Sequence, residues 1–322
     1  MIDNSYLMSE ANAFDKRIEE RRKAGFVPDI RRSVKCNYFY KSFWRDPYFI
    51  DIYIGEMIST YLIMLQENGG KNLKILDVGC GAGYISLELA RAGHHVVAID
   101  ISESCIKIAK ETLKSNPYKK GFGSLEYHVL PFTDTKGTYD AILFSGVLHH
   151  FDKIEQSICK AIDLLSTSGL ILCHEPCHEE WRYQDAAQIA LIRGLLSIAG
   201  IWYETGLGDE LISSSQDNFK SYIDSIHTEY VSEKDQHEKK QSPNDNIVTG
   251  QEILKYLRKY LIEIEYKKSF SFIYRVLGGL RGNDETIHKI AAFLTNFDKL
   301  SVNNGYLMPN YFYFIGRKAT VY

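Results

Sequence analysis

Apolar runs alternate with helical patterns through the middle of the chain, between residues 73 and 176. The segments between the runs, such as SCIKIAKETLK, carry the spacing of amphipathic helices. A continuous apolar run indicates a strand buried on both faces, which is typical of a parallel sheet covered by helices. The pattern predicts strands at 73–78, 95–100, 125–130, 139–145 and 169–175.

The flanking segments are predicted to be mainly helical. An aromatic-rich extension precedes the alternation, and a helical insertion with a polar loop at 232–246 follows it. Two late β-like segments, 262–276 and 311–318, flank a further helix. The sequence therefore predicts an α/β fold in four parts: an N-terminal extension or lid at 1–70, a core at 71–176, an insertion at 177–260 and the last two strands at 261–322.

The composition is that of an ordinary globular chain, and it excludes some function classes. With 322 residues and a formal net charge of −3, the chain does not suit nucleic-acid binding, which usually needs a basic protein. It shows neither a secretory leader nor an uncharged apolar stretch of about 18 residues, so no membrane span is expected. Six scattered cysteines indicate reduced thiols and a cytoplasmic location. The oligomeric state is open, and a homodimer is compatible with the sequence.

Residues 75–86, ILDVGCGAGYIS, are the most informative segment for function. The strand ends in Asp77, and Gly79, Gly81 and Gly83 follow at alternate positions. Such a turn lets the backbone approach a ligand closely, because glycine has no Cβ. The sixth place of a G-x-G-x-x-G frame holds Tyr84, where a dinucleotide-binding turn needs a small residue. The turn is therefore poorly suited to a pyrophosphate, and the acid before it favours a ligand with a positively charged amino group.

Asp100 ends the second strand, 23 residues beyond Asp77. A carboxylate there can accept hydrogen bonds from both hydroxyls of a ribose. Alternatively, Asp100 caps the next helix, which opens with the N-terminal signature ISES. The two roles are compatible, and the glycine turn upstream favours ribose binding.

Four segments in this order, DVGCGAG, VVAIDIS, YDAILFSGVLHHFD and LLSTSGLILCHEP, resemble the successive motifs of class I S-adenosylmethionine-dependent methyltransferases. The resemblance is to the small-molecule branch, which includes ubiquinone-type, sugar and natural-product methyltransferases. It implies a Rossmann-like seven-stranded sheet with strand order 3-2-1-4-5-7-6 and S-adenosylmethionine as cofactor.

The resemblance also implies roles for residues of the core. Asp77, Gly79 and Gly81 would hold the methionine end of the cofactor, and Ser145 would border it. Asp100 would hold the ribose, and Ile101 would pack on the adenine. The chain departs from the family after the third strand, where YHVLPFTD is shortened and has no acid at Val129 or Leu130 to meet the adenine amino group.

Candidate catalytic residues follow the fourth and fifth strands. Methyl transfer to a hydroxyl needs a proton acceptor, and a histidine suits this task. His149 and His150 lie in the relevant loop, and His149 is preferred; the alternative is that both are structural. Glu175 is expected to orient a histidine, bind the acceptor or cap the next helix.

No metal site is predicted. The compact cluster of Cys173, His174, Cys177 and His178 lacks a second Cys/His group to complete a tetrahedral site. The aromatic segment 38–45 is expected to serve as a lid over the cofactor or as a helix packed on the sheet.

The sequence thus predicts an enzyme that methylates a small molecule. Oxygen is the preferred acceptor, on a sugar, glycolipid precursor or secondary metabolite. Two alternatives stay open: N- or C-methylation of a metabolite, and an inactive cofactor-binding subunit.

Overall fold

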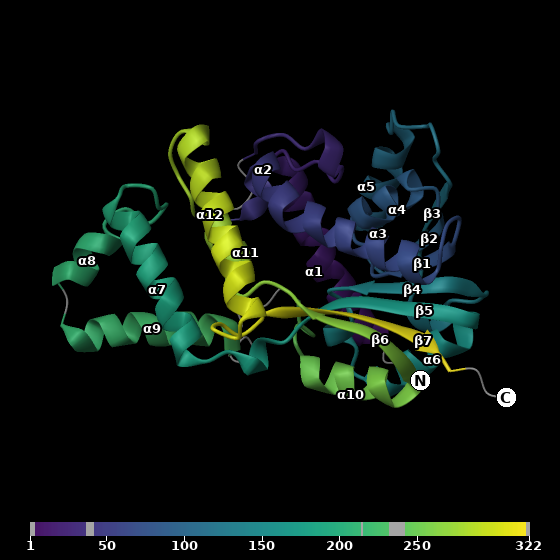
Figure 1. Ribbon diagram of the computed structural model, residues 1–322. Helices are drawn as coiled ribbons and strands as arrows, with labels where there is room; N and C mark the ends of the chain where they lie inside the picture. Colours follow the sequence, from purple (N-terminus) through teal and green to yellow (C-terminus); the bar gives the residue numbers. More distant parts are fainter. Residues whose placement is uncertain (1–3, 37–41, 214, 232–241, 320–322) are drawn as a thin grey trace.

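A seven-stranded sheet of order β3-β2-β1-β4-β5-β7-β6 forms the centre of the chain (Figure 1). The computed structural model describes residues 4–36, 42–213, 215–231 and 242–319. β1 to β5 are parallel, and β7 runs antiparallel to both of its neighbours. The predicted sheet order is confirmed. The strands are β1 (Lys74–Val78), β2 (His95–Asp100), β3 (Ser124–Val129), β4 (Tyr139–Ser145), β5 (Leu165–Pro176), β6 (Leu261–Lys268) and β7 (Tyr311–Lys318).

Helices connect the parallel strands and extend the fold at three places. Those between strands of the core are α4 (Tyr84–Arg91), α5 (Glu103–Lys114) and α6 (Ile154–Leu164). The N-terminal part holds α1 (Asn4–Lys23), α2 (Pro47–Ile50) and α3 (Glu56–Asn68), the last two joined by a π-helical turn, Asp51–Gly55. The later helices are α7 (Tyr183–Ile198), α8 (Leu207–Ser213), α9 (Gln216–Val231), α10 (Gly250–Tyr260), α11 (Ile273–Leu277) and α12 (Asp284–Asn303).

Alternate residues of each central strand supply two hydrophobic cores, one on each face of the sheet. In β1, Ile75 belongs to one core, whereas Leu76 and Val78 belong to the other. In β4, Leu143 and Phe144 are divided in the same way. Because both faces are buried, the strands are apolar throughout, which explains the sequence pattern.

The predicted strand at 262–276 is wrong beyond Lys268. Asp298 of α12 accepts hydrogen bonds from the backbone N–H groups of Ser271, Phe272 and Ile273, at 2.7 to 2.8 Å. These contacts satisfy the donors at the start of α11, so the chain turns into a helix instead of continuing the sheet. Burial raises the pKa of Asp298 to about 6, although the three N–H groups oppose this shift.

One helix in the described part of the chain, Pro47–Asn68, is long and apolar enough to cross a membrane by length and composition. It spans 22 residues, and 56% of its most apolar window is buried inside the protein. Phe49 and Tyr61 are fully buried within it. A core helix passes the same test, so the finding is weak evidence for a membrane span.

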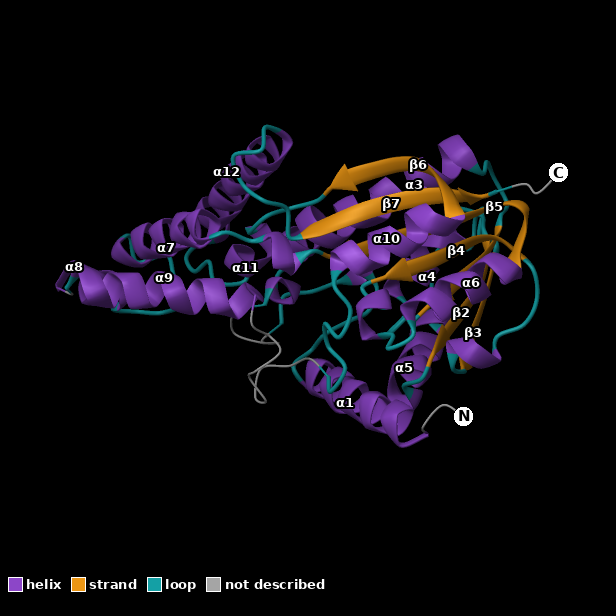
Figure 2. Cartoon of the chain, turned by 90° about the horizontal axis from the view of Figure 1, so that it is seen from below, coloured by secondary structure: helices purple, strands orange, loops and turns teal. Residues whose placement is uncertain are grey.

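The insertion forms an arm. Helices α7, α8 and α9 extend away from the sheet on the side where α12 lies, as two views show (Figures 1 and 2). Helix α1 lies apart from this arm, near α5 (Figure 2).

Candidate active site

A cavity of about 480 Å³ lies at the carboxyl ends of β1, β2 and β4. In an open α/β sheet, this edge is where ligands bind. All six residues expected to hold the cofactor line the cavity: Asp77, Gly79, Gly81, Asp100, Ile101 and Ser145.

The glycine turn needs glycine at two positions for steric reasons. Gly79 and Gly83 have φ angles of +67° and +81°, which side chains rarely adopt. A Cβ at Gly79 would lie 2.5 Å from a methyl group of Val147, and one at Gly83 would lie 2.3 Å from the hydroxyl of Tyr127. At Gly81 (φ +53°) a Cβ would meet no described atom within 4 Å. The backbone at Gly81 is therefore open to the cavity.

Asp77 is buried at the base of the turn. The hydroxyl of Ser86 donates a hydrogen bond to its carboxylate at 2.5 Å. Burial raises the pKa of Asp77 to about 7, and the nearby charge of Asp100 adds to this shift, while the Ser86 bond opposes it. A cationic group in the cavity would favour the ionised carboxylate.

Asp100 lines the cavity and also fixes the backbone of two neighbouring turns. Its two carboxylate oxygens accept hydrogen bonds from the N–H groups of Gly81 (2.7 Å) and Ser102 (2.8 Å). The cap of α5 itself is Ser102, whose hydroxyl accepts from the N–H of Cys105. Burial raises the pKa of Asp100, and its backbone hydrogen bonds oppose the rise.

Helix α1 forms one wall of the cavity, which the sequence did not indicate. Tyr6, Glu10, Phe14, Arg17 and Arg21 are among its lining residues. They repeat every three or four positions, so they mark one face of the helix.

The segment predicted as a lid takes another place in the part that the structure describes. Phe43 and Trp44 pack on each other, and Trp44 also contacts the rings of Phe26 and Tyr84. Trp44 is buried in the core, and it is not among the described residues that line the cavity. Residues 38–41 of the predicted lid lie outside the described residues.

The segment after β3 lines the cavity with Leu130, Pro131, Phe132 and Thr133. Leu130 donates its N–H to the carbonyl oxygen of Asp100 at 2.9 Å. The described lining residues of this segment include no acid.

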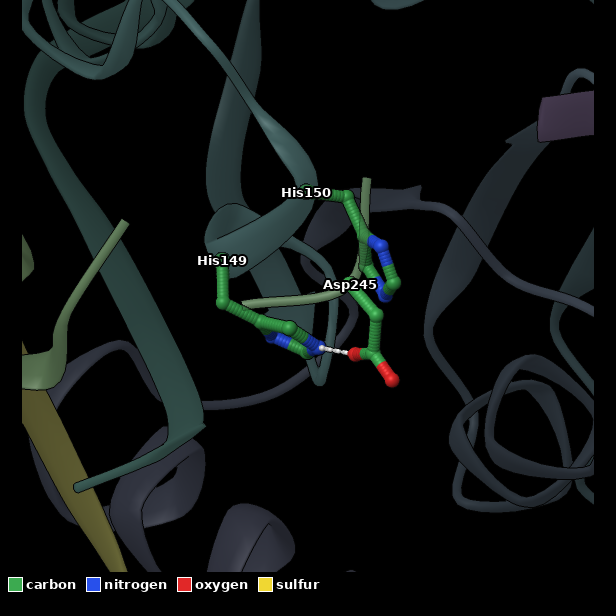
Figure 3. A group of neighbouring side chains, drawn as sticks. All are labelled: His149, His150 and Asp245. Atoms are coloured by element: carbon green, nitrogen blue, oxygen red, sulfur yellow. Dashed lines mark ion pairs between the residues drawn. The ribbon is translucent and has the colours of Figure 1, made fainter. Parts of the chain in front are cut away.

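His149 lies between two carboxylates. Its Nδ1 is 2.8 Å from Glu175 Oε2, and its Nε2 is 3.5 Å from Asp245 Oδ1 (Figure 3). Glu175 also accepts the N–H groups of Val147 (2.9 Å) and Leu148 (3.0 Å), so it holds the whole turn in place. Burial lowers the pKa of His149, but the hydrogen bonds to Asp245 and Glu175 outweigh this and raise it to about 9.

His150 is the histidine that lines the cavity; His149 and Glu175 are not among its described lining residues. Its Nδ1 is 3.0 Å from Glu10 Oε1 and 3.2 Å from the hydroxyl of Ser242. Burial and the charge of His149 lower the pKa of His150, against the opposing effect of Glu10. The sequence favoured His149, but of the two histidines His150 is the one in contact with the cavity.

Glu10 and Asp245 are site residues that sequence reasoning missed. Glu10 also accepts the side-chain N–H of Asn244 at 2.8 Å, which ties α1 to the segment before α10. Ser242, Asn244 and Asp245 are buried, although they fall in a stretch expected to be a polar loop. The rest of that loop, 232–241, lies outside the described residues.

The sheet order and the cavity above a glycine turn define the Rossmann-like fold of class I S-adenosylmethionine-dependent methyltransferases. A family model described as a methyltransferase domain matches residues 70–258, more than half of the chain. The chain belongs to this family.

Curated relatives match about a third of this chain. The ubiquinone biosynthesis O-methyltransferase of Pelagibacter ubique (strain HTCC1062) is 32% identical over 120 residues, which cover 37% of this chain and 49% of the relative. A mitochondrial enzyme of the same name from Schizosaccharomyces pombe is 29% identical over 34% of this chain and 40% of its own length. The chain thus spans about half or less of the length of these relatives.

Solved structures show the same fold across nearly the whole chain. The mycolic acid cyclopropane synthase CmaA1 has a TM-score of 0.55 at 13% identity and covers 97% of this chain and 98% of its own. The [4+2]-cyclase SpnF has a TM-score of 0.53 at 12% identity and covers 97% and 95%. At this level of identity, the similarity concerns the fold alone.

Proposed function

We propose that this chain transfers the methyl group of S-adenosylmethionine to an oxygen atom of a small molecule. The proposal rests on one observation: the glycine turn, Asp77, Asp100 and His150 all line the same cavity. The name of the curated relatives, ubiquinone biosynthesis O-methyltransferase, supports an oxygen acceptor and gives no support to a sugar or glycolipid. The cytoplasmic location and the homodimer stay predictions.

The residues of the cavity fit this cofactor. The carboxylate of Asp77 suits the ammonium group of its methionine end, and the open backbone at Gly81 allows a close approach. Asp100 presents a carboxylate for the ribose hydroxyls, and Ile101 an apolar surface for the adenine. When bound, the cofactor supplies an electrophilic methyl group on a positively charged sulfur.

The protein's part in the reaction is to position the acceptor and to remove its proton. Glu175 and Glu10 fix the rings of His149 and His150 at one end of the cavity. In this proposal an acceptor hydroxyl loses its proton at the turn 148–150. Helix α1 forms one wall of the cavity, and this wall would limit the access of water and so strengthen the electrostatic interactions inside.

Calorimetric titration with S-adenosylmethionine and its demethylated product tests the proposal. We expect micromolar binding of both, and about a tenfold to hundredfold loss of affinity in Asp100→Ala, because the ribose loses a charged acceptor. Glu103→Ala is the matched control, since this exposed acid lies three residues away at the start of α5. The proposal fails if the unaltered chain binds neither ligand.

Cofactor affinity is expected to fall as the pH drops below 7. Asp77, whose pKa is raised to about 7 by burial, must ionise to pair with the ammonium group. Below this pKa the carboxyl is protonated, so binding must first release a proton; at pH 6 the affinity should be about tenfold below its plateau. Titrations from pH 5.5 to 8 measure this slope. Asp77→Asn should flatten it, and a slope unchanged in that variant would contradict the assignment.

A further inference from the structure

Two carboxylate–imidazole pairs meet beside the cavity, and a third carboxylate joins them. Glu175 holds Nδ1 of His149 at 2.8 Å, and Glu10 holds Nδ1 of His150 at 3.0 Å. Nε2 is thus the second nitrogen of each ring, and in His149 it lies 3.5 Å from Asp245 Oδ1. The two rings lie close together, with centroids 4.1 Å apart, and Asp245 approaches them from a distant segment (Figure 3).

This arrangement has the features of a metal site. Histidines that bind metals almost always donate the N–H of their other ring nitrogen to a carboxylate, a backbone carbonyl or water, which fixes the tautomer and the ring orientation. One ligand atom each of His149, His150 and Asp245 lies within 4.8 Å of the others. All three residues are buried, so an ion among them would be shielded from water on most sides.

The spacing of His149 and Asp245 also suits a shared ion. Their Nε2 and Oδ1 atoms are 3.5 Å apart, which is long for a hydrogen bond. Two ligands on one tetrahedral ion, each about 2.0 to 2.1 Å from it, are about 3.3 Å apart. A small movement of either side chain would therefore accommodate the ion.

We propose that His149, His150 and Asp245 bind a divalent transition-metal ion such as Zn²⁺ at the edge of the cofactor cavity, with Glu175 and Glu10 as outer partners. Two imidazoles and one carboxylate suit this class of ion and leave a coordination position open. The open position would bind the acceptor hydroxyl while the hydroxyl's proton passes to water, and this use rests on the proposed function. The binding of the ion itself does not depend on that function.

A titration with Zn²⁺ tests the site. The full chain is stripped with a chelator, dialysed and titrated against a chromophoric Zn²⁺ indicator. We expect one ion per chain, about 100-fold or more weaker binding in Asp245→Asn and His149→Ala, and about 10- to 100-fold weaker binding in Glu175→Gln. Asp245→Asn preserves the shape of the side chain, and circular dichroism checks that each variant is folded.

The chain offers a matched control at a second, more exposed group of Asp46, Asp284 and His288. His288→Ala should leave Zn²⁺ binding unchanged. The proposal is overturned if the stripped chain binds no stoichiometric Zn²⁺, or if Asp245→Asn and His149→Ala bind it as tightly as the unaltered chain. S-adenosylmethionine titrations on the same samples keep the two proposals apart: cofactor binding without Zn²⁺ binding rejects the metal site alone.

Discussion

His150→Ala is expected to lower turnover by about 10²- to 10⁴-fold, which is the range for the loss of a group that helps to remove a proton. His150 is the histidine of the 148–150 turn that lines the cavity, so its loss removes the group that activates the acceptor oxygen. The measurement is single-turnover methyl transfer at saturating cofactor, once the acceptor is known. A screen of hydroxylated aromatic and lipid precursors with labelled cofactor would identify it.

Two further variants define what this result means. His128→Ala is the control, because this histidine is about half exposed at the end of β3. Its turnover should be unchanged, and cofactor affinity should be unchanged in both variants. Near-normal turnover in His149→Ala and His150→Ala would contradict proton removal at this turn and favour an amine acceptor, which needs little more than orientation and desolvation.

The sheet and the cofactor residues could be predicted because their signals are local. Asp77 and the glycines form one contiguous turn, and Asp100 ends the next strand, so short motifs place them at the same sheet edge. The apolar runs reflect burial on both faces, which each strand carries in its own residues.

The remaining site residues could not be predicted because they depend on long-range packing. Glu10 lies in α1, and Asp245 precedes α10, yet both meet the histidine turn. No local pattern says which acid of a charged helix will be buried. The same reason explains the error at 262–276. The strand ends before the apolar pattern does, because the distant carboxylate of Asp298 binds the backbone N–H groups at the start of α11.

A buried network also fixes the N-terminal segment to the helix that follows the glycine turn. The guanidinium of Arg91 in α4 donates two hydrogen bonds of 2.8 Å to the two oxygens of Asp29, and a third of 2.6 Å to Glu88. It also contacts the side-chain oxygen of Asn116 at 2.7 Å. The side chains of Arg91, Asp29 and Glu88 are 1%, 0% and 4% exposed, so the charges are desolvated.

Arg91→Met is therefore expected to lower the free energy of unfolding by about 3 to 5 kcal/mol, because two carboxylates would stay buried without their main partner. Arg31, which binds Glu88 from the surface, would compensate for only part of the loss. Urea denaturation measures the change. Arg22→Met is the control, since its ion pair with Glu111 is about half exposed on both sides and should contribute about 0 to 1 kcal/mol. Equal losses in the two variants would show that the network does not hold the N-terminal segment, and with it α1, over the cofactor cavity.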